Sequence, residues 1–194
     1  MDFKQRVYSV LIVSAAEKFN ISMMKLFPDF KYHPVQVESG VSAAKRALLE
    51  REFDFVAINS PLPDEDGIRL AIDTCSGKNS VVLLFVRSEL YNPIYDKVSK
   101  HGVYVLSKPT SRQVINNALD WMASTRERLR KLERKNLSLE DKMQEIRIVN
   151  RAKWLLITEL SMTEEDSHRY IEKQAMDRCV SKKEVAEEII KTYS

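Results

Sequence analysis

The sequence predicts an α/β fold followed by a helical region, and three observations support this. Five short runs rich in β-branched and aromatic residues alternate with helical patterns over roughly the first 120 residues. The run at 81–86 is apolar at every position and the run at 7–13 nearly so, which is typical of strands covered by helices on both faces. No Gly or Pro follows Thr110, so nothing obliges the later helices to break. We therefore expect a doubly wound parallel sheet, then a long helix and a small three-helix C-terminal domain.

The positions of the expected strands indicate where a functional crevice would lie. They cover 7–13, 33–38, 54–59, 81–86 and 103–107, and the helices between them cover 17–26, 41–50, 67–74 and 93–100. In a doubly wound sheet the crevice lies beyond the carboxyl ends of the strands. Functional residues are therefore expected just after Val13, around Asn59, within 85–88 and near Lys108.

A heptad repeat follows the sheet region. Helical periodicity starts at Val114, and with Met122 at position a the best a and d positions are Leu129, Leu132, Asn136, Leu139, Met143 and Ile146. An Asn at position a pairs with its counterpart across a two-stranded coil and sets the register. We expect a homodimeric coiled coil over 119–150. The alternative is a single amphipathic helix packed on its own domain.

Two capping signals organise the C-terminal region. Thr163 followed by Asp166, and Ser181 followed by Glu184, have capping-box spacing and predict helices ending near Arg178 and near residue 192. Together with a helical segment at 154–160 they form a domain expected over 151–194. Its core is predicted to contain Trp154, Leu156, Ile157, Leu160, Tyr170, Ile171, Met176, Val185, Ile189 and Ile190.

Composition excludes several classes of protein. A hydrophobic fraction of 44% with 30% charged residues is typical of a globular chain. The N-terminus lacks a secretory pattern and no apolar run could span a bilayer. Cys75 and Cys179 fit no metal or redox spacing. We expect a cytoplasmic protein with no membrane contact, no cofactor and no metal.

The positive charge is concentrated in one segment. The net charge is +3, but residues 126–153 contain ten Lys and Arg against five acidic residues. Such a segment is either a solvated charged helix or part of a surface for an anionic partner.

Two motifs resemble the receiver domains of response regulators. SPLPDEDG (60–67) resembles the loop after the third receiver strand, and SKP (107–109) resembles the Lys-Pro at the end of the fifth. They occur in the right order and spacing over 7–120. The resemblance implies a flavodoxin-like (βα)5 receiver domain at 1–118.

The residues that a receiver needs for its phosphorylation are changed in this sequence. A receiver binds Mg²⁺ through an acidic pair after the first strand and through the phosphoacceptor carboxylate, but the equivalent positions are Ser14, Ala15 and Asn59. An amide is neither a nucleophile for phosphoryl transfer nor an anionic metal ligand. Of the phosphorylation residues only Lys108 remains. The resemblance thus implies a pseudo-receiver without catalytic residues, and the protein is not expected to be an enzyme.

Two further features of this site can be read from the sequence. The switch hydroxyl after the fourth strand is replaced by Phe85 or Val86, while Ser88 is displaced. The acids at 64–66 are either solvated loop residues, which we favour, or a displaced metal site.

The C-terminal region resembles the ANTAR RNA-binding antitermination module. The resemblance lies in RAKWLLI (151–157), EEDSHRYIEKQAMD (164–177) and SKKEVAEEII (181–190). It implies a dimer that binds paired hairpins in leader mRNA. The RNA-binding candidates are Arg151, Lys153, His168, Arg169, Lys173, Arg178, Lys182 and Lys183.

The charge of this region limits how RNA would be bound. Residues 151–194 hold eight Lys and Arg against nine acids, so RNA contact requires a local basic patch. Tyr170 could stack on a base or lie in the core, and for Trp154 we favour the core.

Two classes of function follow. The first is an RNA-binding antiterminator controlled by something other than phosphorylation, such as a regulatory protein partner. The alternative is a protein-interaction adaptor that docks a signalling partner through the pseudo-receiver and the coil. DNA binding is disfavoured, because no C-terminal helix has the Arg, Asn and Gln density of a recognition helix.

Overall fold

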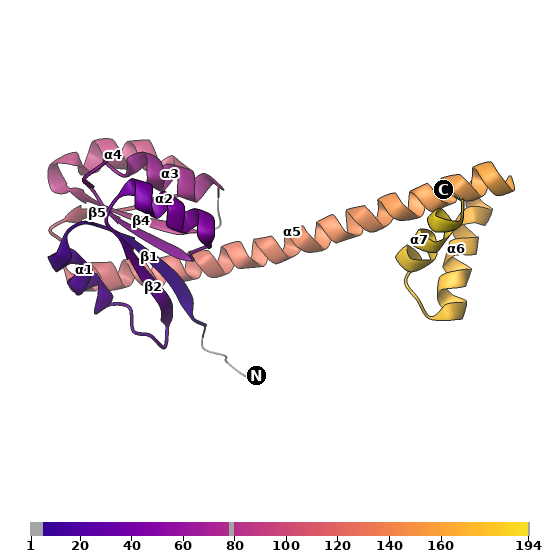
Figure 1. Cartoon of the computed structure of the whole chain (residues 1–194), viewed down its shortest axis with the longest axis horizontal. Coiled ribbons are helices and arrows are strands. Elements are labelled where there is room, and N and C mark those ends of the chain that lie inside the picture. The colour runs from indigo at the N-terminus through magenta and orange to yellow at the C-terminus, as the bar shows by residue number, and fades with distance from the viewer. Residues whose placement is uncertain (1–5, 78–79, 194) are drawn as a thin grey trace. The chain divides into compact units, whose positions relative to one another are not determined.

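A computed structural model describes residues 6–77 and 80–193 and contains a five-stranded parallel sheet (Figure 1). The strands are β1 (Tyr8–Val13), β2 (Tyr32–Glu38), β3 (Phe55–Asn59), β4 (Val81–Arg87) and β5 (Tyr104–Lys108). Their order is β2-β1-β3-β4-β5, and every neighbouring pair is parallel. Each strand begins and ends within one residue of its predicted position, which confirms the doubly wound fold.

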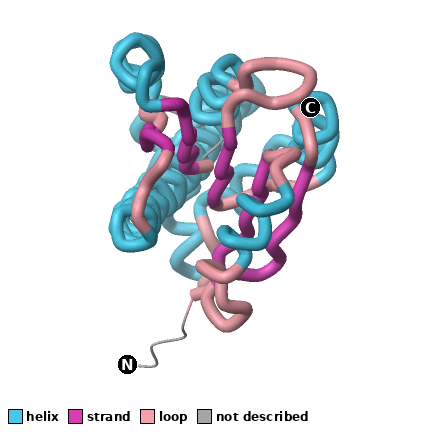
Figure 2. Tube along the Cα trace, turned by 90° about the vertical axis from the view of Figure 1, so that its left-hand side faces the viewer, coloured by secondary structure: helices cyan, strands magenta, loops and turns pink. Residues whose placement is uncertain are grey.

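Helices cover both faces of the sheet. They are α1 (Glu17–Met24), α2 (Val41–Glu50), α3 (Ile68–Gly77), α4 (Tyr91–Val98) and the first part of α5 (Arg112–Leu160), with 3₁₀ turns at Ser88–Leu90 and Ser99–His101. Helices α2, α3 and α4 lie on one face, and α1 and α5 lie on the other (Figure 1). Figure 2 shows the strands lying side by side with helices around them.

Side chains along each strand alternate between the two faces of the sheet, so each face has its own hydrophobic core. In β1, for example, Leu11 and Val13 pack with α2, α3 and α4, whereas Val10 and Ile12 pack with α1 and α5. All four side chains are fully buried. Because both faces of the sheet are covered, the central strands β1, β3 and β4 are largely apolar runs, and this pattern helped to predict them.

Contacts divide the chain into two compact units, with the division after Arg130. Helix α5 begins in the first unit and ends in the second. No helix in the described part of the chain combines the length and the apolar character needed to cross a bilayer.

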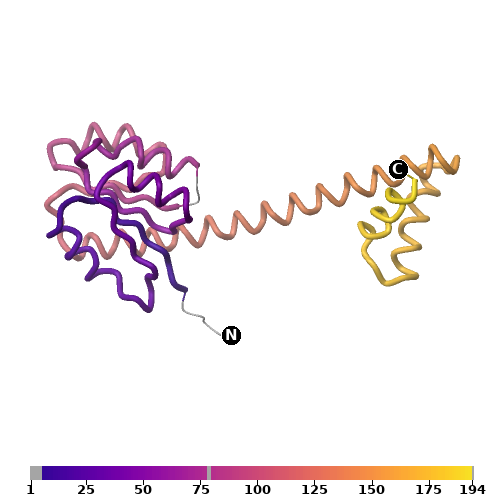
Figure 3. Tube along the Cα trace, viewed as in Figure 1, coloured from indigo at the N-terminus to yellow at the C-terminus, as the bar shows by residue number. Residues whose placement is uncertain are grey.

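The second unit contains the end of α5 with α6 (Glu164–Arg178) and α7 (Lys182–Tyr193), which lie side by side (Figure 3). Both capping predictions are confirmed. The Asp166 amide donates to Thr163 Oγ1 at 3.1 Å. Ser181 and Glu184 form a reciprocal box, in which each backbone amide donates to the other side chain, at 3.1 and 3.2 Å.

The core of the second unit is smaller than predicted. It comprises Ala152, Leu156, Ile171, Ala175, Val185, Ala186 and Ile189, with Ile190 partly buried against it. The prediction was wrong for four large side chains, because Trp154 is 62% exposed, Leu160 47%, Tyr170 42% and Met176 77%. Three short helices cannot enclose so many large residues, so small residues, Ala152, Ala175 and Ala186, sit at the contacts instead.

Candidate functional site

The carboxyl ends of β1, β3 and β5 bring Ser14, Asn59 and Lys108 together, as predicted. Asn59 Nδ2 donates to Ser14 Oγ at 3.0 Å, and Lys108 Nζ donates to Asn59 Oδ1 at 2.6 Å and to the Ser60 carbonyl at 2.5 Å. Ser14 and Asn59 are buried. The position after Ser14 is Ala15, whose side chain has no polar atom. The crevice is therefore filled by a hydrogen-bonded chain of an alcohol, an amide and an ammonium group.

The charge balance of this crevice follows from the missing carboxylates. Burial lowers the pKa of the Lys108 ammonium, and the nearby Arg87 guanidinium lowers it further. In a receiver that keeps its aspartates, the surrounding negative charge would instead raise the pKa of this lysine. The described residues contain no group of three or more His, Cys, Asp or Glu side chains able to hold a metal ion.

Phe85 and Val86, the two candidates for the switch position, are both fully buried apolar side chains. Phe85 is the β4 residue paired with Asn59 and is fully buried, and its ring meets that of Phe19 edge-on at 5.1 Å. Ser88 lies in the 3₁₀ turn after β4, where its hydroxyl donates to the Lys108 carbonyl at 2.8 Å. A phenyl ring therefore lies beside Asn59, and the nearby Ser88 hydroxyl is hydrogen-bonded to the Lys108 carbonyl.

The loop acids cap helices. Asp64 accepts hydrogen bonds from the amides of Val41 and Ser42, at 2.9 and 3.0 Å, at the start of α2. These bonds lower the pKa of the Asp64 carboxyl to about 2. A Cβ at Gly40 would lie 2.8 Å from Asp64 Oδ1, so the close approach requires glycine there. Asp66 accepts from the Ile68 amide at the start of α3.

An ion-pair cluster at the opposite end of the sheet anchors the start of α5. Asp54, which precedes β3, accepts hydrogen bonds from Arg126 at 2.8 Å and Arg130 at 2.7 Å. Asp54 also accepts from the Ser9 amide at 3.1 Å. Asp54 and Arg126 are buried. We did not predict this cluster, because its partners lie more than 70 positions apart in the chain.

The predicted coil positions divide into two groups. Leu129, like Met122 before it, packs on the core between the sheet, α1 and α5. Leu132, Leu139, Met143 and Ile146 are 48%, 47%, 56% and 59% exposed, and Asn136 is exposed as well. The apolar stripe left uncovered on α5 in this single chain therefore begins at Leu132 rather than at Leu129.

The eight RNA-binding candidates differ in their partners. Six form ion pairs within the second unit: Lys153–Glu164, His168–Glu172, Arg169–Glu165, Arg178–Glu188, Lys182–Glu172 and Lys183–Glu187. Arg151 and Lys173 form none among residues 6–77 and 80–193 and are exposed. A hydrogen bond from Lys182 and the charge of His168 lower the pKa of Glu172. Exposed ion pairs of this kind contribute little to stability, because water and salt screen them.

Three of these candidates converge on one groove. A hollow of about 380 Å³ is lined by Lys142, Glu145, Ile146, Val149, Asn150, Lys153, His168 and Lys182. Lys142 and Asn150 were not predicted, although their spacing from Ile146 and Lys153 follows one face of a helix. The other candidates, Arg151, Arg169, Lys173, Arg178 and Lys183, do not line this groove.

Comparison with known proteins agrees with both halves of this description. Residues 137–190 match the ANTAR domain. The signal receiver domain of an HD domain-containing protein from Pseudomonas fluorescens Pf-5 superimposes with a TM-score of 0.57 at 22% identity, covering 68% of this chain and 96% of that one. A two-component transcriptional regulator AraC from Clostridium phytofermentans ISDg gives 0.57 at 14% identity, covering 63% and 98%. At these identities the likeness concerns the fold.

The chain thus combines a receiver fold with a C-terminal ANTAR domain, which is a receiver–ANTAR architecture. Along most of its length it is similar to the transcriptional regulatory protein PdtaR of Mycobacterium tuberculosis. The two are 26% identical over 184 residues, which cover 94% of this chain and 89% of PdtaR.

Proposed function

We propose that this protein regulates transcription antitermination by binding, as a dimer, to hairpins in leader mRNA, and that aspartyl phosphorylation does not control it. The protein acts in the cytoplasm and is not an enzyme. Its working parts are a pseudo-receiver at 1–118, a coiled-coil helix at 119–150 and an RNA-binding module at 151–194. The groove between α5, α6 and α7 is the observation that carries the proposal.

The groove supports RNA as the ligand. Lys142, Lys153 and Lys182 supply three ammonium groups to one hollow, whose lining contains one acid, Glu145. Lys153 and Lys182 are also paired with Glu164 and Glu172, which an RNA phosphate would replace. Lysines hold phosphates, while an imidazole and an amide, here His168 and Asn150, can stack on or hydrogen-bond an unpaired base. Unpaired bases are presented by hairpin loops, and these are the RNA elements that proteins read by sequence.

The exposed stripe on α5 supports a dimer. Four large apolar side chains repeat at heptad spacing without a covering partner in the single chain, namely Leu132, Leu139, Met143 and Ile146. A second copy of the helix would bury them and place Asn136 against its counterpart.

The crevice supports independence from phosphorylation. Ser14, Asn59 and Lys108 satisfy one another with neutral or cationic groups, and no carboxylate stands at the acceptor position. A regulatory protein partner or ligand then has to supply the input that phosphorylation supplies in other receivers.

The test for RNA is a binding titration of the full chain against a two-hairpin leader RNA and a DNA duplex of equal length, at several salt concentrations. We expect stronger binding to the RNA. Lys142→Gln with Lys182→Gln should weaken it and reduce the slope of log affinity against log salt by roughly 0.7 per lost phosphate contact. Lys191→Gln, an exposed α7 lysine outside the groove, is the matched control. Equal affinity for RNA and DNA would exclude the antiterminator.

A protein-interaction adaptor is the second candidate. It is favoured by the six ion pairs that occupy most of the basic candidates of the second unit. For an adaptor we expect no RNA binding at any salt concentration. The groove double variant and Lys191→Gln should then give the same result in the RNA titration.

A further inference from the structure

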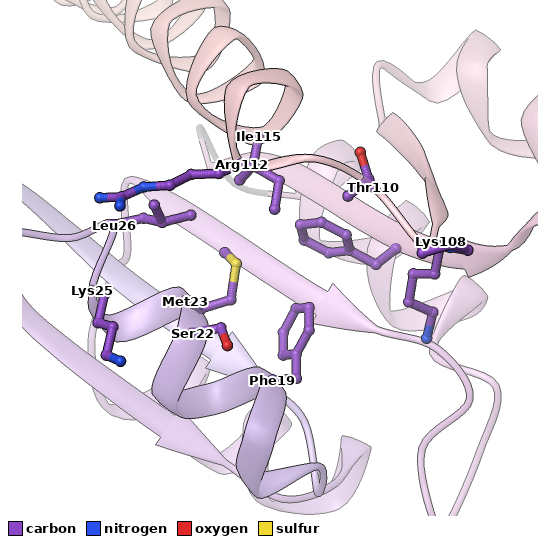
Figure 4. A pocket seen from close by; sticks show the side chains of 11 residues that line it. Phe19, Ser22, Met23, Lys25, Leu26, Lys108, Thr110, Arg112 and Ile115 are labelled. Carbon is purple, nitrogen blue, oxygen red and sulfur yellow. The ribbon is translucent and has the colours of Figure 1, made fainter.

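A second cavity lies in the receiver unit, between α1 and the segment that joins β5 to α5. It has a volume of about 460 Å³ and is lined by Phe19, Ser22, Met23, Lys25, Leu26, Phe85, Lys108, Pro109, Thr110, Arg112 and Ile115. Figure 4 shows these side chains around the opening. The volume falls within the range of pockets that hold small organic molecules, about 300–1,000 Å³.

The interior of this cavity is apolar. Phe19 from α1 and Phe85 from β4 form an edge-on aromatic pair, and Met23 and Ile115 lie beside them. Phe85 lines this space near the carboxyl end of β4 and is itself fully buried. The cavity therefore lies beside the crevice that contains Asn59 and Lys108.

The rim of the cavity is cationic. Lys25 follows α1, and Arg112 begins α5 (Figure 4). Both side chains are exposed and form no ion pair within the described ranges 6–77 and 80–193. None of the lining residues is acidic. Lys108 adds a third cationic group, whose ammonium donates hydrogen bonds to Asn59 and Ser60.

We propose that this cavity binds a small amphipathic carboxylate, with its apolar body against Phe19, Met23 and Ile115 and its carboxylate at Arg112 and Lys25. A guanidinium group binds a carboxylate through two parallel hydrogen bonds, and a neighbouring ammonium adds a point charge. Ser22 and Thr110 offer hydroxyl groups at the same opening. The apolar interior selects against small inorganic anions, and the cationic rim selects against neutral hydrocarbons.

The ligand would bridge α1 and the first turns of α5. Arg112 and Ile115 belong to α5, whereas Phe19 and Met23 belong to α1. Occupancy would therefore hold the start of α5 against the sheet and provide a chemical input to a receiver that lacks its phosphoacceptor. The site is separate from the groove of the second unit, so its test does not depend on RNA binding.

Calorimetric titration of the full chain with three probes tests the inference. Octanoate has both features, octanamide has the same body without the charge, and acetate has the charge without the body. We expect one saturable octanoate site per chain, octanamide binding at least about tenfold weaker, which corresponds to about 1.4 kcal/mol, and no acetate binding. Equal binding of octanoate and octanamide, or no saturable binding of octanoate, would overturn the proposal.

Two variants locate the site. Lys25→Gln with Arg112→Gln should weaken octanoate to the level of octanamide, whereas Lys18→Gln, an exposed α1 lysine outside the cavity, should leave the affinity unchanged. Ser22→Phe, which fills the opening from an exposed position, should abolish binding while circular dichroism shows an intact fold. Unchanged octanoate affinity in the double variant would place the probe elsewhere and refute the assignment.

Discussion

Lys108 Nζ lies 2.6 Å from Asn59 Oδ1, in the place where a receiver pairs its lysine with the phosphoacceptor carboxylate. The framework that holds the lysine is retained, and Asn59 in turn donates to Ser14. The crevice therefore contains a hydrogen-bond network in which Ser14, Asn59 and Lys108 are paired with one another.

We expect Lys108→Met to destabilise the protein. Methionine cannot donate, so the Oδ1 of the buried Asn59 loses the partner that the structure gives it, at a cost of about 1–3 kcal/mol in the free energy of unfolding. Urea titration followed by circular dichroism measures the change. The matched control is Lys100→Met at an exposed position. Equal unfolding midpoints for the two variants would show that the bond to Asn59 contributes nothing.

Acetyl phosphate with Mg²⁺ should not phosphorylate the wild-type protein. Asn59→Asp alone should also remain unmodified, because Ser14 and Ala15 still provide no acidic pair for the metal. Intact-protein mass spectrometry after incubation measures the product. A stoichiometric phosphoprotein in the wild type would contradict the proposed independence from phosphorylation.

Asp64 should make stability depend on pH in the acid range. Its pKa is lowered to about 2 in the folded chain from an ordinary value of 3.8, because it caps α2. The stability that this carboxylate contributes is complete above about pH 4 and is lost as the pH falls towards about 2. The difference in unfolding midpoint between wild type and Asp64→Asn should therefore shrink over that interval.

The control for Asp64 is Asp96→Asn, an exposed α4 residue away from the α2 terminus. The difference in unfolding midpoint between wild type and Asp96→Asn should not shrink over the same pH interval. A constant difference between wild type and Asp64→Asn from about pH 5 to about pH 2 would mean that the capping bonds do not act as the geometry indicates.

Removing Asp54 should be among the most disruptive single changes in the receiver unit. Asp54→Ala leaves the buried Arg126 without the carboxylate that it contacts at 2.8 Å, and we expect a loss of about 3–5 kcal/mol in the free energy of unfolding. Chemical denaturation measures this loss in the free energy of unfolding. The control is Asp96→Ala, which removes an exposed acid.

A charge-free replacement separates pairing from packing at this cluster. Changing Asp54 to Leu and both Arg126 and Arg130 to Met removes the charges of all three partners. Glu127, which also pairs with Arg130, keeps Arg6 as a partner. This triple variant should be more stable than Asp54→Ala. If it is less stable, the ion pairs themselves, and not the stranded charge, carry the effect.

The uncovered stripe on α5 should mediate dimerisation. Leu139→Lys with Met143→Lys places two charges on side chains that are 47% and 56% exposed in the single chain, and we expect the dimer to become a monomer. Light scattering coupled to size-exclusion chromatography measures the mass. Leu49→Lys, at a residue 84% exposed on α2, should leave the dimer intact. A monomeric wild-type protein would refute the proposed coiled-coil dimer.

Local sequence was sufficient for much of this protein. Strand runs such as 81–86 and the capping pairs at Thr163 and Ser181 depend on neighbours within a few residues, so they could be read directly. The identities of Ser14, Asn59 and Lys108 also located the altered crevice, because parallel strands in this topology always end at one edge.

Only the tertiary structure decided which partner each side chain meets. Periodicity indicates that a helix face is covered but does not say by what, so Leu129 was assigned to the coil although it packs on the receiver core. Trp154 was assigned to a core that turned out too small to enclose it. Asp64 at α2, Asp54 at Arg126 and the cavity beside Phe85 depend on contacts between distant segments, which fold geometry creates and local pattern does not record.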